Sequence, residues 1–134
     1  RTLPVRVETN GTFYVELSDE KGSPSDRDLP YGEIADAFDD EINNTAHVTS
    51  SIDDFEIDAR RRDGQNIEGL ITYYTEPIPY KGYSATRENT TLEELNTFKR
   101  EIYENGLRLY NKKWTLEQAI ADAQTKEDLD QIVW

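Results

Sequence analysis

The side chains in this sequence that could do chemistry are mainly carboxylates. The chain has 134 residues and carries 28 Asp and Glu against 15 Lys and Arg, with one histidine and no cysteine. Two carboxylates about 5–9 Å apart can hydrolyse a glycosidic bond, but the spacing of so many acids singles out no pair. His47 lies between Ala46 and Val48 on an expected strand, where a lone imidazole is more often structural than a general base. Gly-x-Ser-x-Gly, HExxH and phosphate-binding glycine loops are absent. We therefore assign no catalytic residue and favour a non-enzymatic protein.

Metal and cofactor sites are not expected either. One histidine and no cysteine leave only carboxylate ligands, which argues against structural zinc. The calcium loop of an EF-hand needs oxygen ligands at fixed positions around a glycine. Counting from Gly64 places Ala59 and Arg61 at ligand positions, and Leu70 where the closing Glu should be. The pattern fails, so no metal ligand and no cofactor is assigned.

The acids are concentrated in one third of the chain. Residues 19–63 hold 14 acidic and 5 basic side chains, which is −9 of the net charge of −13. Such a charge repels nucleic acid and anionic membranes, so neither is expected as a ligand. No apolar run is long enough to span a bilayer. We expect a soluble protein of the host cytoplasm or of a virion, although secretion stays open.

The hydrophobic pattern predicts one α+β domain over residues 1–134. Asn10-Gly11 between two alternating segments predicts a β-hairpin at about 3–17. A second hairpin is expected at about 54–75, and the two hairpins should form a small antiparallel sheet. In the second hairpin, Ile67 to Thr75 is the expected returning strand. Between the two hairpins a loop is expected at 18–30, followed by a helix at about 31–43. The C-terminal third should be helical, with one helix from the Thr91 cap to Asn105-Gly106, a second from the Thr115 cap and a last short one from Thr125.

The expected helix at 31–43 carries an acidic face. Glu33, Asp36 and Asp40 follow one another at helical spacing, and Asp39 lies beside them. Acids in the last turn of a helix oppose its dipole and each cost about 0.3–1 kcal/mol. Their placement therefore suggests binding of a basic partner, imitation of a phosphate track, or a demand for solubility.

The expected strand at the start of the second hairpin extends the acidic surface. Asp54, Glu56 and Asp58 alternate along it, and residues on one face of a strand lie about 6.5–7 Å apart. That spacing resembles the spacing of phosphates along a DNA strand. Arg60-Arg61-Arg62 follows, and either neutralises Asp58 and Asp63 locally or projects as a basic finger.

Aromatic side chains form a second candidate surface. Pro77 and Pro79 lack the N–H that a strand ladder needs, so residues 76–83 are expected to be an extended, Tyr-rich connector. Tyrosine is enriched at protein interfaces, although these rings could equally hold the connector against its own core. The candidate aromatic contacts are Tyr73, Tyr74, Tyr80, Tyr83 and Trp134.

Two functional hypotheses remain. The stretch from Trp114 to Trp134, with its Thr-capped short helices, resembles the tails of small bacteriophage proteins. The resemblance covers 21 residues, rests on helix caps and implies no function or site residue. The first hypothesis is an acidic interaction or assembly protein, encoded by a phage or another mobile element, that binds a protein with a basic surface or copies of itself. The alternative is a DNA mimic that inhibits a host nucleic-acid-binding or defence protein.

Overall fold

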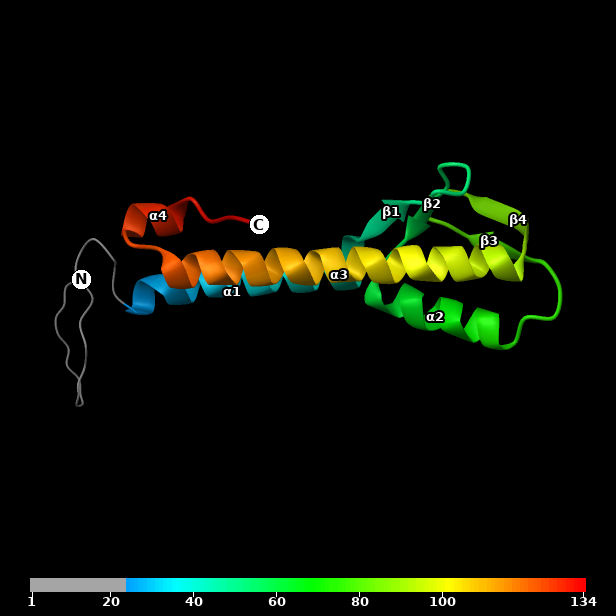
Figure 1. The fold of residues 1–134 in the computed structure, drawn as a ribbon, viewed down its shortest axis with the longest axis horizontal. Helices are drawn as coiled ribbons and strands as arrows, with labels where there is room; N and C mark the ends of the chain where they lie inside the picture. The colour runs from blue at the N-terminus through cyan, green and yellow to red at the C-terminus, as the bar shows by residue number, and fades with distance from the viewer. Residues whose placement is uncertain (1–23) are drawn as a thin grey trace. The chain divides into compact units, whose positions relative to one another are not determined.

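The computed structural model describes residues 24–134, and these residues form two compact units (Figure 1). Unit 1 comprises 24–37 together with Lys112–Trp134, and unit 2 comprises Phe38–Asn111. The hairpin expected at about 3–17 lies outside the described residues. The expectation of a single domain over residues 1–134 stays a prediction.

The expected α+β class is confirmed. Helices α1 and α3 each contribute to both units, whereas all four strands belong to unit 2. The elements in chain order are α1 (Pro24–Asp40), the π-helical η1 (Glu41–Thr45), β1 (His47–Thr49), β2 (Glu56–Asp58), α2 (Arg61–Thr72), β3 (Ile78–Lys81), β4 (Thr86–Thr90), α3 (Leu92–Asp122) and α4 (Lys126–Asp130).

The first helix begins earlier than the sequence indicates. A helix was expected at about 31–43 after a loop at 18–30, but residues 24–30 are already helical. Pro30 lies within α1 rather than in its first turn. The helix continues as the π-helical turn η1, which ends at Thr45. The expected loop is therefore wrong for residues 24–30.

The strands of unit 2 form two separate antiparallel pairs. In the first, Val48 of β1 lies opposite Ile57 of β2, and in the second Ile78 of β3 lies opposite Thr90 of β4. The hairpin expected at about 54–75 is wrong in its second half, because residues 61–72 form α2. The strand at its start is present but pairs with the segment before it.

The β3–β4 pair corrects the expected connector at residues 76–83. Ile78–Lys81 is a strand despite Pro79, because the register shifts between Ile78 and Tyr80. This irregularity falls at the proline, where the ladder needs no N–H donor. Tyr80 is thereby directed into the core rather than toward solvent.

The core of unit 2 surrounds Phe98 of α3. Its ring stacks on Tyr80 at a centroid distance of 5.4 Å and meets Phe55 at 5.9 Å. Figure 1 shows α2 along one side of α3 and the strands along the other. Through Phe98, α3 thus packs against β3 and the segment before β2.

Helix α3 is longer than expected from the turn and cap residues within its sequence. Its N-terminus is as expected: the amide of Glu94 donates to the Thr91 hydroxyl at 3.2 Å, and the Thr91 amide donates to the Glu94 carboxylate at 3.0 Å. Asn105-Gly106 and Thr115 were expected to end one helix and start another. Both expectations are wrong, because the helix continues to Asp122.

Unit 1 packs the start of α1 against the end of α3 and against α4. A buried cluster of Ile34, Ile120 and Leu129 joins the three helices, with Trp134 packed against it. Arg27 reinforces this contact by donating to the carbonyl oxygens at the end of α3, at 3.2 Å and 2.9 Å. The unit therefore has a small core of its own.

Candidate protein-interaction surface

An apolar groove lies between α2 and α3 in unit 2. It is a hollow of about 290 Å³. This volume lies at the lower end of the range of about 300–1,000 Å³ for small-molecule sites. The groove is therefore large enough to take one or two inserted side chains. The residues lining it are Ile42, Ala59, Arg60, Arg61, Gly64, Ile102, Tyr103, Gly106, Leu107 and Tyr110.

The two glycines shape the groove in different ways. A Cβ at Gly64 would lie 3.4 Å from the ring of Tyr103, an ordinary van der Waals distance, so α2 and α3 are in close contact at this residue. A Cβ at Gly106 would have no neighbour within 4 Å. Gly64 therefore lies at the contact between the two helices, whereas Gly106 leaves open space in the groove.

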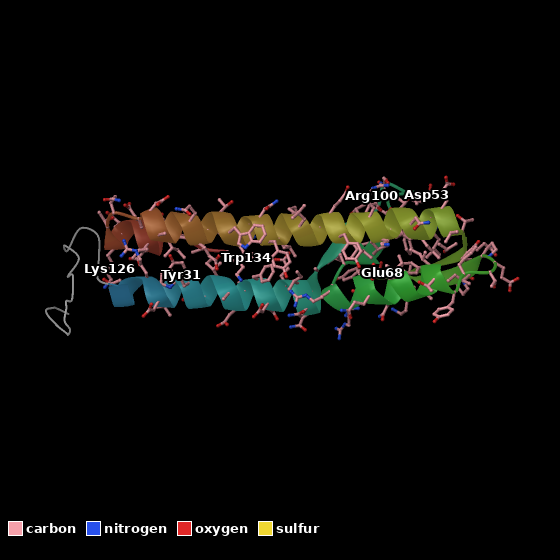
Figure 2. The ribbon with its side chains drawn as sticks, turned by 60° about the horizontal axis from the view of Figure 1, so that its bottom comes forward. Tyr31, Asp53, Glu68, Arg100, Lys126 and Trp134 are labelled. Atoms are coloured by element: carbon pink, nitrogen blue, oxygen red, sulfur yellow. The ribbon has the colours of Figure 1, made fainter. Side chains whose placement is uncertain are left out.

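Two large apolar side chains of the groove are in contact with water. Tyr103 is 46% exposed and Leu107 is 56% exposed, one helical turn apart on α3. Burial and a hydrogen bond to Glu68 raise the pKa of the Tyr103 phenol. The hydroxyl therefore has a hydrogen-bond partner on α2. Figure 2 marks Glu68 on α2.

Arginines occupy one rim of the groove. Arg60 donates to Asp63 at 2.7 Å and lies 3.5 Å from Asp58, so local neutralisation is its role in the fold. Arg61 donates to the Tyr110 hydroxyl at 2.9 Å and is otherwise exposed. Arg62 is exposed and forms no ion pair with another described residue. Two guanidinium groups therefore remain available to solvent.

The expected acidic residues on α1 are exposed. Glu33 and Asp36 belong to unit 1, and Asp39 and Asp40 belong to unit 2. The carboxylate of Asp40 accepts a hydrogen bond of 3.0 Å from Asn44. These four acids are thus exposed, and their role as an interaction surface stays a prediction.

Of the acids expected on one strand face, Glu56 and Asp58 share a face of β2 opposite the buried Ile57, whereas Asp54 lies outside the strand. Asp54 lies in the turn before β2 with a positive φ of 54°. Asp58 lies 3.5 Å from Arg60. Glu56 receives the Thr49 hydroxyl and a ring nitrogen of His47, each at 2.5 Å, and these contacts lower its pKa. The structure thus engages Glu56 and Asp58 with their own chain.

The expected aromatic residues differ widely in exposure. Tyr73 at the end of α2 is 83% exposed, and Tyr74 is partly buried. Tyr83 is exposed and stacks on His47 at 4.2 Å. Tyr80 is buried, and burial together with the charges of nearby acids raises its pKa to about 12. Trp134 packs in unit 1 beneath Lys112, whose Nζ lies 4.1 Å from the ring centroid (Figure 2).

The groove residues Tyr103 and Leu107 were not identified from the sequence. Together with Tyr110 they recur at helical spacing, which would have indicated a third stripe on α3. Ending the helix at Asn105-Gly106 concealed that stripe.

A carboxylate network outside the groove fixes the turn after β1. Glu101 accepts hydrogen bonds from the Ser50 hydroxyl at 2.5 Å, the Ser51 amide at 2.9 Å and the Ser51 hydroxyl at 2.7 Å. Burial is the largest single influence on Glu101 and raises its pKa, but these hydrogen bonds together lower it below the ordinary 4.5. The charged form is therefore favoured in the folded state.

Acid should weaken unit 2 partly through Glu101. A carboxyl with a lowered folded pKa stabilises the fold above its unfolded pKa, and this stability is lost as the pH falls through the folded pKa. Thermal unfolding followed between about pH 6 and about pH 3 should show a falling midpoint below 4.5. Glu101→Gln should unfold at lower temperature at neutral pH and show a shallower decline in acid. Glu104→Gln, which removes an exposed carboxylate 3.7 Å from Arg100, is the control. An unchanged slope in Glu101→Gln would contradict this assignment.

The described residues offer no arranged metal site. Among residues 24–134, no three His, Asp or Glu side chains come together as possible ligands. Within the same residues, no helix is both long enough and apolar enough to cross a membrane.

Comparison with known proteins gives no relative: no family model, curated protein or solved structure matches this chain. The function is therefore argued from the groove and its surroundings.

Proposed function

We propose that this chain is a non-enzymatic interaction or assembly protein whose contact surface is the apolar groove of unit 2. The observation that carries the proposal is the exposure of Tyr103 and Leu107 beside a hollow of about 290 Å³. Protein interfaces place aromatic and aliphatic anchors in such hollows, and arginine and tyrosine are enriched there. A partner that inserts a side chain would remove both exposed side chains from water.

Gly106 adds to this argument. A glycine in the interior of a helix is less favourable than alanine by about 0.8–1.0 kcal/mol. Nothing in the protein lies close enough to forbid a side chain at this position. The fold itself therefore does not require the glycine, whereas a partner in the groove would benefit from the space.

The test compares two leucine variants. Gly106→Leu places a side chain in the groove, and Gly69→Leu adds the same side chain to α2 at an exposed position that also has open space. Wild type and both variants are immobilised, and proteins of the source organism bound to each are identified and quantified. We expect a partner that is retained by wild type and Gly69→Leu and reduced at least about tenfold by Gly106→Leu. Its affinity is then measured by calorimetry with purified proteins.

Equal recovery on all three proteins would contradict the role of the groove. Circular dichroism of both variants shows whether the helices are intact. If Gly106→Leu does not fold, Leu107→Ala, which shortens an exposed side chain, replaces it.

The DNA-mimic alternative rests on the exposed acids Glu33, Asp36 and Asp39. It is weakened by the internal contacts of Glu56 and Asp58. A mimic would compete with DNA for its target and would not be affected by Gly106→Leu. Competition by duplex DNA, together with a Gly106→Leu protein that binds normally, would favour the mimic over the interaction protein.

A further inference from the structure

The groove has a partner surface within the same sequence. On α1, within unit 1, Leu29 is 68% exposed, although it is a large apolar residue. Asp28 precedes it, Glu33 follows one turn later and Asp36 follows two turns later. We call Asp28, Leu29, Glu33 and Asp36 the acidic helix face. It presents one large apolar side chain next to carboxylates, and Leu29 and Glu33 also border a hollow of unit 1. The same hollow is lined by Lys126, Leu129, Ile132 and Val133.

The acidic helix face is exposed, and its carboxylates are not paired with other described residues. All four side chains are exposed. Asp28, Glu33 and Asp36 form no ion pair with another residue in the range 24–134. A helix that binds in a groove places apolar side chains there, and Leu29 would supply that anchor.

The groove of unit 2 complements this face in shape and charge. Its walls are apolar and fit a leucine, while no acidic residue lines it. Arg61 lines the groove and is exposed, and Arg62, the next residue of α2, is exposed and forms no ion pair with another described residue. Guanidinium groups bind carboxylates with two parallel hydrogen bonds. An exposed cation therefore lies at the groove, and exposed acids lie on the same helix as Leu29.

We propose that the acidic helix face of one copy binds in the groove of a second copy. Leu29 enters the hollow between Tyr103 and Leu107, and Glu33 and Asp36 approach Arg61 and Arg62. The inference rests on the proposed function and names the partner of the same groove.

The contact is heterologous, because the two surfaces in it are different. Each bound copy still has one free groove or one free helix face, so the association continues into a ring or a filament. A single helix in a groove buries less than the roughly 1,200–2,000 Å² of a stable complex, so the affinity should be in the micromolar range. The net charge of −13 makes two copies repel each other. At about 0.01 M salt this repulsion extends over about 30 Å and opposes association, whereas at about 0.1 M salt it extends over only about 10 Å and opposes association less.

The experiment is analytical ultracentrifugation of the purified chain in about 0.1 M salt, the condition in which the repulsion is screened. Wild type and the control Gly69→Leu should show an average mass that rises with concentration above the 15.5 kDa of one copy. Leu29→Asp, which lacks the apolar contact, and Gly106→Leu, which lacks the open groove, should each remain monomeric.

Mixing the two variants tests the arrangement. Leu29→Asp retains a groove and Gly106→Leu retains a helix face, so an equal mixture should form dimers and nothing larger. A mixture that stays monomeric while wild type assembles would overturn the head-to-tail contact. Assembly of either variant alone would also overturn it.

Charge reversal provides a second route if a variant fails to fold. Arg61→Glu with Arg62→Glu should abolish assembly, and mixing this protein with the Glu33→Arg and Asp36→Arg protein should restore it, because the helix face of each variant is then complementary to the groove of the other. A wild type that is monomeric at every concentration would overturn self-binding. In that case, groove-dependent capture of a different protein would still support the proposed function, so the two failures are distinguishable.

Discussion

Replacement of Phe98 by alanine should lower the free energy of unfolding of unit 2 by about 3–5 kcal/mol. The ring has 0% exposure and contacts Tyr80 and Phe55. Removing it deletes buried apolar surface and leaves a cavity between α3 and the strands. Urea unfolding followed by fluorescence and circular dichroism measures the change, and an unchanged m-value would show that the unfolding transition itself is preserved.

The matched comparison is Phe98→Leu, which keeps most of the apolar volume. It should lose less stability than the alanine variant, because the remaining cavity is smaller. A loss below about 1 kcal/mol in Phe98→Ala would place the residue outside the core and contradict the packing described above.

The second large effect is expected at Gly82, next to β3. A Cβ here would lie 2.6 Å from the carbonyl oxygen of Glu56 and would overlap the ring of Phe55. The backbone has little freedom to move away, because the Gly82 amide donates to Ala85 at 2.7 Å and the Tyr83 amide donates to Glu56 at 2.9 Å. Gly82→Ala should therefore destabilise unit 2 by about 1–3 kcal/mol or more.

A change of opposite sign provides the control. Gly69→Ala in α2 has no neighbour within 4 Å and should stabilise the protein by about 0.5–1 kcal/mol through helix propensity. The two glycine-to-alanine variants are compared by thermal unfolding. If both variants shift the midpoint of thermal unfolding in the same direction, the result would contradict the close contact of Gly82 with Glu56 and Phe55.

Local signals were reliable where a cap was followed by a clear helical stripe. The Thr91 cap is present, and the Thr125 hydroxyl accepts from the Asp128 amide at 2.9 Å at the start of α4. The prediction of a strand from Ile67 onward was wrong, because the β-branched and aromatic residues of this segment are typical of strands. The segment belongs to α2, whose buried residues Gly64 and Ile67 lie at helical spacing. At the start of α2 the Arg60 amide donates to the Asp63 carboxylate at 2.9 Å, which caps the helix.

The length of α3 could not be predicted from its composition. Asn105-Gly106 is a common helix end, but Ile102 and Leu109 are buried on either side of it. Packing of these residues outweighs the cost of a glycine within the helix. The groove depends on this continuity, so the sequence alone did not place Tyr103 and Leu107 on one helix face.

The acidic surface was predicted in part. Exposed acids on a helix follow from hydrophobic periodicity, and Glu33 and Asp36 fulfil that expectation. The partners of Glu56 could not be foreseen, because Thr49 and His47 belong to a strand whose pairing depends on a turn with residues of positive φ. Such pairing is decided by tertiary structure rather than by local propensity.

The proline in β3 has a consequence for aggregation. In a sheet of two strands, each strand has an unpaired edge that could recruit a strand from another chain. Pro79 offers no N–H to such a strand, and the exposed Lys81 at the end of β3 would place a charge in the new pairing. The edge of β3 is therefore a poor template for β-sheet growth between chains.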